Sequence, residues 1–209
     1  MEREEILDVA ARLFMEKGYH ATSTRDLAEA LGIQKASLYY YIKSKDDLLV
    51  EIVNYGADDL LHMLDSLGNG TANPRQCLYL AIKNHFRLLA RKRDYAVVAM
   101  LERRALPQEA RENYLRKRSL YEKGIRSIVQ DGMDGGFFPQ GDAALVARTV
   151  LGIVNWTCQW FNPEKGKSLE EIGEELMGWI FQQLLNPHLS NVPVERPVKD
   201  ADSTMSLQR

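Results

Sequence analysis

Apolar residues recur every three or four positions along nearly the whole chain, and no segment keeps the strict alternation of a β-strand. Residues 2–17 place an apolar stripe on one face of a predicted helix, and Gly18 follows it as a helix-ending glycine. A second helix is expected from Ser23, whose spacing to Asp26 is that of a capping box, to a stop at Gly32. The pattern predicts an all-α protein that begins with short helices.

The next segment predicts two more helices. Lys35–Ile42 forms the third, in which Leu38 and Ile42 lie one turn apart and face inward. Ser44 is expected to cap a fourth helix that runs from Lys45 toward residue 64. Three helices followed by a longer one describe a small N-terminal domain.

A polar stretch rich in glycine, residues 66–74, predicts a linker. We therefore expect a small N-terminal domain over residues 1–66, a larger helical domain over 67–188 and a disordered tail over 189–209. Five helices are expected in the larger domain, over 75–91, 95–106, 108–131, 143–161 and 169–186.

Composition and charge fit a globular protein. Of the 209 residues, 45% are apolar and 27% charged, and the formal net charge of −2 argues against a non-specific nucleic-acid binder. Positive charge is nevertheless concentrated between Ala30 and Lys45, where three lysines and no acidic residue occur. The acidic, amphipathic N-terminus and the lack of a long apolar run predict neither a signal peptide nor a membrane span. Two isolated cysteines, Cys77 and Cys158, predict reduced thiols and a cytoplasmic protein.

The third helix carries residue types that read DNA. A Gln side chain can bond adenine with two hydrogen bonds, Lys can reach guanine or phosphate, and Ala or Tyr carbons can contact thymine methyl groups. The starts of the second and fourth helices add side chains and free amides for phosphates. This is the docking arrangement of a helix-turn-helix. The predicted DNA contacts are Thr24, Arg25, Gln34, Lys35, Ala36, Ser37, Tyr39, Tyr40, Tyr41 and Lys45.

At these residues the chain resembles the TetR family of bacterial transcriptional regulators, over residues 7–55. The matching motifs are Ala10–Phe14 with Gly18-Tyr19, Thr22–Ala28, Gly32–Ile42 and Ser44–Leu48. Gln34, Ala36 and Ile42 depart from the usual Ser, Gly and Phe of the family. Gln34 and Ala36 face DNA in this interpretation, so they bear on which operator is read.

The resemblance implies a ligand-responsive repressor. Such regulators bind a palindromic double-stranded operator as homodimers, pair their last two helices with those of the second subunit, and leave DNA when a small molecule enters the larger domain. Gly152 and Gly178 fit this expectation because glycine lets helices approach closely. A close contact within one chain explains Gly152 equally well.

A narrower resemblance concerns residues 155–172. Asn155-Trp156, Trp160-Phe161 and the Pro-Glu-Lys-Gly stretch after them are similar to a segment of TetR-type regulators of fatty-acid and steroid catabolism, several of which sense acyl-CoA thioesters. The effector-binding candidates are Met100, Arg148, Gly152, Trp156, Trp160 and Phe161. The alternative is that both tryptophans are anchors of the dimer core.

Three other functions are weighed. An enzyme is not expected, because the chain has no nucleophile elbow, P-loop, dinucleotide fingerprint or metal spacing, and neither a cofactor nor a metal is predicted. A constitutive helix-turn-helix protein would have a fully packed second domain, whereas a sensor would have a cavity there. A multidrug-type sensor of apolar compounds is the third alternative.

Overall fold

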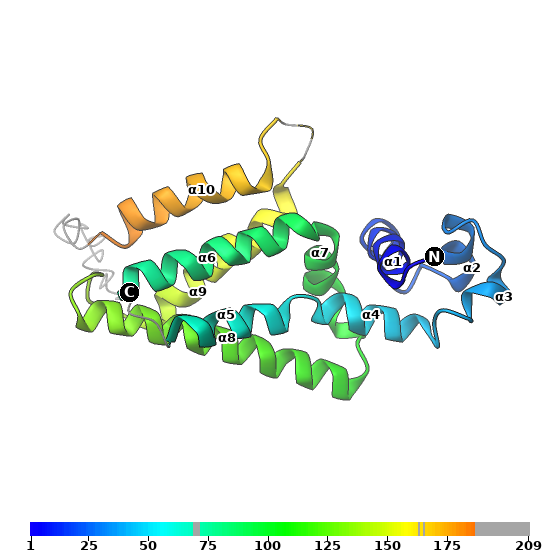
Figure 1. The fold of residues 1–209 in the computed structure, drawn as a ribbon, viewed down its shortest axis with the longest axis horizontal. Helices are drawn as coiled ribbons and strands as arrows, with labels where there is room; N and C mark the ends of the chain where they lie inside the picture. The colour runs from blue at the N-terminus through cyan, green and yellow to red at the C-terminus, as the bar shows by residue number, and fades with distance from the viewer. Residues whose placement is uncertain (69–71, 163, 165, 187–209) are drawn as a thin grey trace, which may run out of the picture.

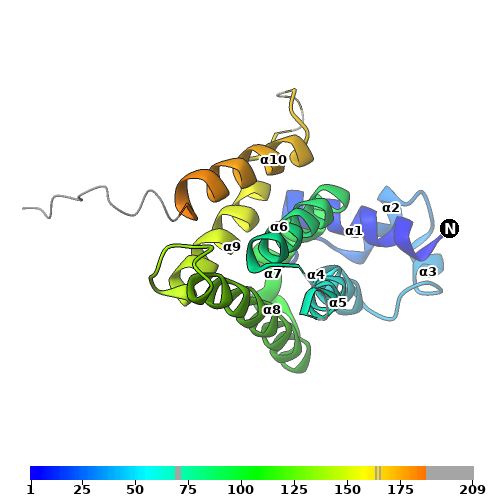
Figure 2. The same cartoon turned by 60° about the vertical axis from the view of Figure 1, so that its left-hand side comes forward.

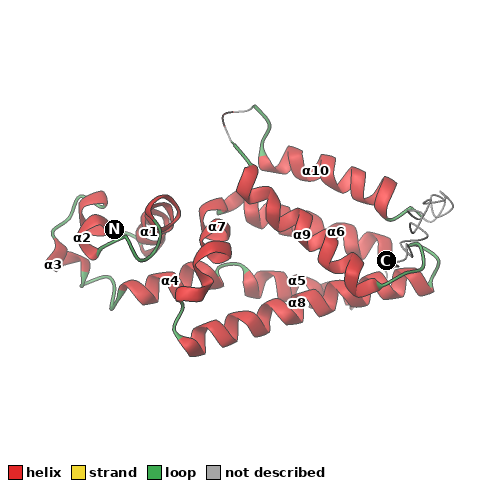
Figure 3. Cartoon of the chain, turned by 180° about the vertical axis from the view of Figure 1, so that it is seen from behind, coloured by secondary structure: helices red, strands yellow, loops and turns green. Residues whose placement is uncertain are grey.

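All regular elements of the described residues are helices, which confirms the predicted all-α fold (Figures 1 and 3). The computed structural model describes residues 1–68, 72–162, 164 and 166–186. The tail predicted over 189–209 and the middle of the predicted linker lie outside these residues. No helix in the described part is long and apolar enough to cross a membrane.

The N-terminal helices begin at the caps that the sequence predicts. They are α1 (Arg3–Lys17), α2 (Thr24–Ala30), α3 (Lys35–Leu38) and α4 (Lys45–Asn54). The Ser23 hydroxyl accepts a hydrogen bond from the Asp26 amide, and the Asp26 carboxylate accepts one from the Ser23 amide, which completes the capping box. Gly18 and Gly32 end the first two helices with positive φ angles of 86° and 67°.

The long fourth helix that we predicted was wrong, because the structure divides this segment into α4 and α5 (Ala57–Gly68). Gly56 separates the two helices and has a φ angle of +72°, which a helix interior does not accommodate. A Cβ atom at Gly56 would lie 2.4 Å from Cδ2 of Leu88, so a side chain has no space there. The third helix is also shorter than predicted: α3 ends at Leu38 and turn hydrogen bonds continue to Ile42.

The larger domain is a bundle of long helices. Its elements are α6 (Pro74–Arg91), α7 (Arg93–Glu102), the 3-10 turn η1 (Arg103–Ala105), α8 (Gln108–Asp134), α9 (Ala143–Trp160), α10 (Leu169–Trp179) and the π-helical turn η3 (Ile180–Leu184). Helix α5 packs on α6 and α8, α9 packs on α8, and α10 lies along α6. Gly173 permits the last contact, since a Cβ atom there would lie 2.7 Å from Cγ of Phe86.

Two hydrophobic cores meet at α7. The smaller core includes Phe14, Leu27 and Leu38 of the N-terminal helices, and the larger includes the buried faces of α5, α6, α8, α9 and α10. Val98 of α7 belongs to the smaller core and its neighbour Val97 to the larger. Helix α7 therefore joins the two domains, and the change of core along the chain falls between α4 and α5, before the predicted boundary at residue 66.

Candidate nucleic-acid interface and ligand cavity

The turn between α2 and α3 presents an exposed surface. Leu38 is fully buried and Ile42 nearly so, which fixes the orientation of the short helix. The predicted DNA contacts around them are exposed: Gln34, Lys35, Ala36, Ser37, Tyr39, Tyr40 and Tyr41. The Tyr40 side chain is 93% exposed, which is unusual for an aromatic residue and leaves its ring free for a partner. The outward face predicted from the sequence is thus present in the fold.

Helix α2 supports this surface from its own N-terminus. The hydroxyl oxygens of Thr24 and Tyr39 lie 3.5 Å apart, so the start of α2 contacts the end of α3 through predicted DNA-binding residues. Arg25 is exposed beside them. The Asp26 carboxylate accepts hydrogen bonds from Ser23 and from the Lys17 ammonium, which together hold its pKa well below the usual range.

Lys45 lies in a different environment from the one we expected. Its ammonium donates to the backbone carbonyl oxygens of Tyr19 and Thr22, both at 2.7 Å, and lies 4.2 Å from the centre of the Tyr19 ring. Two of its three N–H donors are therefore used within the protein. The Tyr19 hydroxyl in turn donates to the Asp46 carboxylate. Lys45 joins α4 to the loop between α1 and α2, and a phosphate contact from it stays a prediction.

Helix α1 is held to α7 by charged and polar contacts. The Lys92 ammonium lies 2.7 Å from a Glu4 carboxylate oxygen and 2.5 Å from one of Asp8. The Tyr95 hydroxyl donates to the same Asp8 oxygen at 2.9 Å, and Glu102 accepts from the Tyr19 amide at 3.0 Å. Burial and the neighbouring carboxylate raise the pKa of Tyr95, so it stays a protonated donor.

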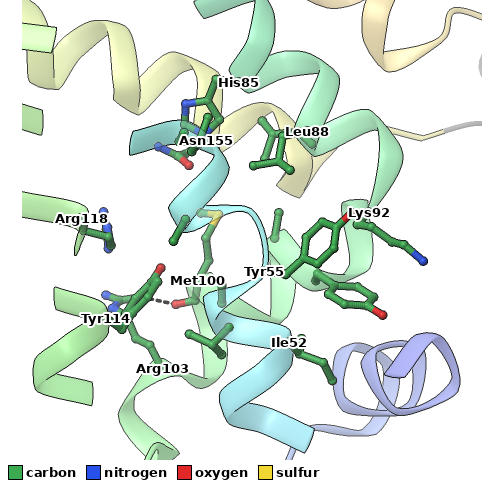
Figure 4. Close-up of a pocket in the computed structure, with 17 residues that line it drawn as sticks. Ile52, Tyr55, His85, Leu88, Lys92, Met100, Arg103, Tyr114, Arg118 and Asn155 are labelled. Atoms are coloured by element: carbon green, nitrogen blue, oxygen red, sulfur yellow. Dashed lines mark hydrogen bonds between the residues drawn. The ribbon is translucent and has the colours of Figure 1, made fainter. Parts of the chain in front are cut away.

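An inner cavity of about 260 Å³ lies behind these contacts. Helix α4 and the residues after it supply Ile52, Val53 and Tyr55, while α7 supplies Tyr95 and Ala99. Figure 4 shows Lys92 at one end, with its ammonium directed away from the cavity toward α1. The same helices that hold the DNA-binding domain therefore form walls of the cavity.

The other end of the inner cavity is polar. Arg103, Tyr114 and Arg118 lie together there, and His85 and Asn155 lie above them in Figure 4. Burial raises the pKa of the Tyr114 hydroxyl, and the charges of Arg118 and Arg103 oppose the rise. Neither arginine has a carboxylate partner among the residues that the structure describes.

A second, outer cavity of about 640 Å³ adjoins this polar end. It contains four of the six predicted effector residues, Met100, Arg148, Gly152 and Trp156, and shares Met100, His85, Arg118 and Asn155 with the inner cavity. Trp160 and Phe161 lie outside both cavities. Phe161 instead ends α9, and its carbonyl oxygen accepts a hydrogen bond from Arg93 at 3.3 Å.

Sequence reasoning missed several cavity residues. His85, Tyr114 and Arg118 line the cavities although no motif marks them, because they come from long helices whose sequences suggest only ordinary packing. The available signal was a histidine on the apolar face of 75–91, between Ile82 and Leu89. A histidine in that position is common in protein cores, so the pattern alone was not decisive.

Helices α9 and α10, which lie on the side of the bundle away from α5 (Figure 2), carry large exposed apolar side chains. Leu145 and Trp156 are each 61% exposed, and Trp160 and Trp179 are 51% and 53% exposed. A Cβ atom placed at Gly152 meets nothing within 4 Å, so no close contact among the described residues explains that glycine. The face is apolar, with open space at its glycine.

Comparison with known proteins gives matches for both domains. Residues 6–52 match the model of bacterial regulatory proteins of the tetR family, and residues 71–184 match the model of the tetracyclin repressor-like C-terminal domain. The HTH-type transcriptional repressor KstR2 of Mycobacterium tuberculosis is 26% identical over 181 residues, covering 86% of this chain and 90% of that protein. These relatives are regulators of transcription and not enzymes.

Solved structures agree with this assignment. PfmR, a TetR family transcriptional regulator from Thermus thermophilus, has a TM-score of 0.75 and 33% identity, covering 84% of this chain and 96% of that chain. AibR in complex with isovaleryl coenzyme A and operator DNA has a TM-score of 0.73 and 28% identity, covering 89% of this chain and 99% of that chain. With its exposed helix-turn-helix and family matches in both domains, this chain belongs to the TetR family of bacterial transcriptional regulators.

Proposed function

We propose that the protein is a repressor that binds a two-fold symmetric operator as a homodimer and releases it when a small acyl compound occupies the cavities. The observation that carries this proposal is that α4 belongs both to the wall of the inner cavity and to the core of the DNA-binding domain. Ile52 and Val53 of α4 line the inner cavity, while Leu48 and Leu49 of the same helix are buried in the core of the DNA-binding domain. A ligand that moves α4 therefore moves the domain that contacts DNA.

The DNA-reading part of the proposal rests on the surface around α3. Gln34 and Ala36 would face the major groove, and Lys35 would contact a phosphate. Tyr39 to Tyr41 with Thr24 and Arg25 would contact the sugar-phosphate backbone and neighbouring base edges. A single such helix gives weak binding, so two copies are needed. In a two-fold dimer the half-sites lie about 34 Å, one turn of B-DNA, or a multiple of it apart.

Pairing of two subunits through α9 and α10 would supply the second DNA-reading helix. Trp156, Trp160 and Trp179 with Leu145 form an exposed apolar face, and burying it against a second subunit removes it from water. The outer cavity takes Gly152 and Trp156 from the same face, so a partner would cover part of its opening. The assembled protein would act in the cytoplasm, where bacterial DNA lies.

The effector class is proposed from the cavities and the relatives together. The AibR structure contains isovaleryl coenzyme A, an acyl-CoA thioester. In this chain an apolar inner cavity joins an outer cavity at a polar end that carries Arg118, which suits an acyl group attached to a larger polar carrier. The cavities also speak against a constitutive DNA-binding protein, for which we expected a fully packed domain.

The test begins with selection of operator duplexes from a random library by the full-length protein. The selected site is then used in fluorescence anisotropy titrations with and without acyl-CoA thioesters of increasing chain length. We expect an inverted repeat, two subunits per site, and release by thioesters but not by coenzyme A alone. Selection of no defined sequence would overturn the DNA-binding proposal, and release by no acyl compound would overturn the effector class.

A multidrug-type sensor is the second candidate, and the apolar walls around Tyr55, Leu88 and Tyr95 favour it. Such a sensor would respond to uncharged apolar compounds of unrelated shapes. Release by these compounds, with no preference for acyl groups, would support this candidate instead.

A further inference from the structure

His85 is a buried residue with an unsatisfied ring nitrogen. It lies on α6, its side chain is 6% exposed, and its Nδ1 atom makes no hydrogen bond in the part of the chain that the structure describes. The ring of Tyr121 meets it edge-on, with 5.4 Å between the ring centres, and leaves Nδ1 unsatisfied. An unsatisfied buried polar group costs about 1–3 kcal/mol, so its presence requires an explanation.

The position of His85 suggests an explanation for its unsatisfied nitrogen. It lines both the inner and the outer cavity, and Asn155 and Arg118 stand with it where the two cavities meet (Figure 4). The Asn155 amide nitrogen donates to the Leu151 carbonyl oxygen at 2.7 Å, which orients that side chain. The Arg118 guanidinium lies 5.9 Å from the centre of the Tyr114 ring. Three polar groups from α6, α8 and α9 therefore line the junction of the two cavities.

The charge at this point favours an oxygen acceptor. No Asp or Glu lines the inner cavity, whereas Lys92, Arg103 and Arg118 do. Lys92 is neutralised by Glu4 and Asp8, so the uncompensated positive charge lies with the two arginines. Burial and the charge of Arg118 lower the pKa of His85 to about 4, so the imidazole is neutral near pH 7 and carries one N–H donor.

The volume of the inner cavity also limits the size of the group that can bind there. Its volume of about 260 Å³ corresponds to about nine water molecules at roughly 30 Å³ each. A flexible or branched apolar group of roughly eight to ten non-hydrogen atoms fills such a space at the density of a protein interior. The walls beyond the polar end are apolar side chains, among them Leu60, Leu88 and Leu89.

We propose that the junction of the two cavities is the binding site for the carbonyl oxygen of an acyl effector, which receives a hydrogen bond from His85 beside Arg118 and Asn155. The inner cavity then holds a medium-length acyl group, and the outer cavity holds whatever the acyl group is attached to. This inference rests on the proposed function for the existence of an effector, and it adds the chemical group recognised and the residue that recognises it. A thioester and a free acid share this carbonyl.

The test is calorimetry on the full-length protein without DNA, with probes that share one eight-carbon body. The probes are octanoyl-CoA, octanoic acid and 1-octanol, with coenzyme A alone as the carrier control. We expect one or both acyl probes to bind at least about tenfold more tightly than 1-octanol, the effect of one well-placed hydrogen bond in a buried site. Tighter binding of octanoyl-CoA identifies the thioester as the source, and tighter binding of octanoic acid identifies the free acid.

The variant His85→Leu keeps a side chain of similar size and removes the hydrogen bond. Its acyl affinity should fall about tenfold while its affinity for 1-octanol is unchanged, so that the selectivity disappears. His62→Leu is the matched control, because His62 is exposed and lines neither cavity, so the same exchange there should leave the selectivity intact. Arg118→Gln changes an exposed position, so it should lower the affinity for acyl probes without affecting folding. If His85→Leu does not fold, the Arg118 variant tests the proposed site in its place.

Two results would overturn the inference: retention of full acyl selectivity by the His85 variant, or binding of 1-octanol as tight as that of the acyl probes. Failure of all acyl probes to bind the wild-type protein would also overturn it. These outcomes are independent of the operator, since DNA is absent. A protein that selects an operator and releases it with a different class of compound would keep the repressor function and lose only this site.

Discussion

The Tyr95 hydroxyl donates a 2.9 Å hydrogen bond to the Asp8 carboxylate and thereby joins a wall of the inner cavity to the first helix of the DNA-binding domain. Tyr95 is buried and lies edge-on to Tyr55, which follows α4 and lines the same cavity. One side chain thus contacts the cavity, α4 and α1. A ligand bound in the inner cavity, as proposed, would contact two elements that pack on the DNA-binding domain, α4 and α7.

We predict that Tyr95→Phe weakens the connection between ligand binding and DNA release. The effector concentration needed for half-release should change several-fold, since coupling between sites is typically worth about 1–3 kcal/mol. Ligand affinity without DNA should change less than about twofold. The measurement is anisotropy of a labelled operator during effector titration, beside calorimetry of the free protein.

The matched control for that prediction is Tyr79→Phe. The Tyr79 hydroxyl also donates to a carboxylate, that of Glu174 at 3.2 Å, but between α6 and α10 and away from α1. It should leave the half-release concentration unchanged. Equal effects of the two variants would mean that the Tyr95 contact has no special role in coupling.

Lys45 and Lys35 should behave in opposite ways. Lys45→Ala removes two hydrogen bonds to the carbonyl oxygens of Tyr19 and Thr22, so it should destabilise the DNA-binding domain by about 1–3 kcal/mol. Lys35→Ala removes an exposed charge, so it should leave stability unchanged and reduce the salt slope of operator binding by about one. Thermal unfolding and affinity at several salt concentrations separate the two. A reduced slope without destabilisation in the Lys45 variant would restore the direct phosphate contact.

Gln34→Ala should change which sequence is read and not how strongly DNA is bound in general. Gln34 is exposed at the start of α3, where its amide can reach a base edge. Loss of a bidentate contact costs about 1–3 kcal/mol at one base pair. Competition between operators that differ at single positions measures this, and Lys35→Ala, which should weaken all of them equally, is the control. An unchanged preference at every position would place Gln34 away from the bases.

His85 should make stability depend on pH. Its pKa is lowered from 6.5 to about 4 in the folded protein, chiefly by burial, so the unfolded chain takes up a proton here before the folded protein does. Protonation then favours unfolding, and stability falls by about 2 kcal/mol as the pH is lowered from about 7.5 to about 5. Urea unfolding of wild type and of His85→Leu should show that this part of the pH dependence disappears in the variant. The exposed His62→Leu is the control and should keep it.

The apolar face on α9 and α10 should form the dimer. Leu145→Glu combined with Trp179→Glu puts charge on that face and should shift the protein toward monomers in sedimentation equilibrium. Leu101→Glu is the matched control, because Leu101 is similarly exposed but lies on α7. A double variant that remains fully dimeric would place the interface elsewhere.

Local signals predicted most helix starts, because a cap needs only neighbours in the sequence. The box at Ser23 and the cap at Ser44 both have the predicted hydrogen bonds. The break at Gly56 was missed because Leu88, which occupies the space beside it, is distant in the sequence. Apolar periodicity continues from α4 into α5, so no local signal separates them.

The candidate site likewise has a part that local sequence signals predict and a part that depends on tertiary packing. The exposed face of α3 follows from the burial of Leu38 and Ile42 alone and could be read from spacing. The hydrogen bond from Lys45 to Tyr19 depends on how α4 packs against α1. The spacing of residues in the sequence does not predict this packing. Likewise the meeting of His85, Arg118 and Asn155 depends on the packing of three long helices, and only the structure brings them together.

None of the described residues that line the two cavities comes from α2 or α3. In the proposed repressor, operator recognition and effector recognition are therefore encoded by separate sets of codons in one gene. After gene duplication, changes around residue 34 could give one copy a new target gene while it still responds to the original effector. Changes in the cavities could instead give it a new effector while it keeps the original target gene. The same separation lets an engineer exchange either specificity of a biosensor built on this scaffold without redesigning the other.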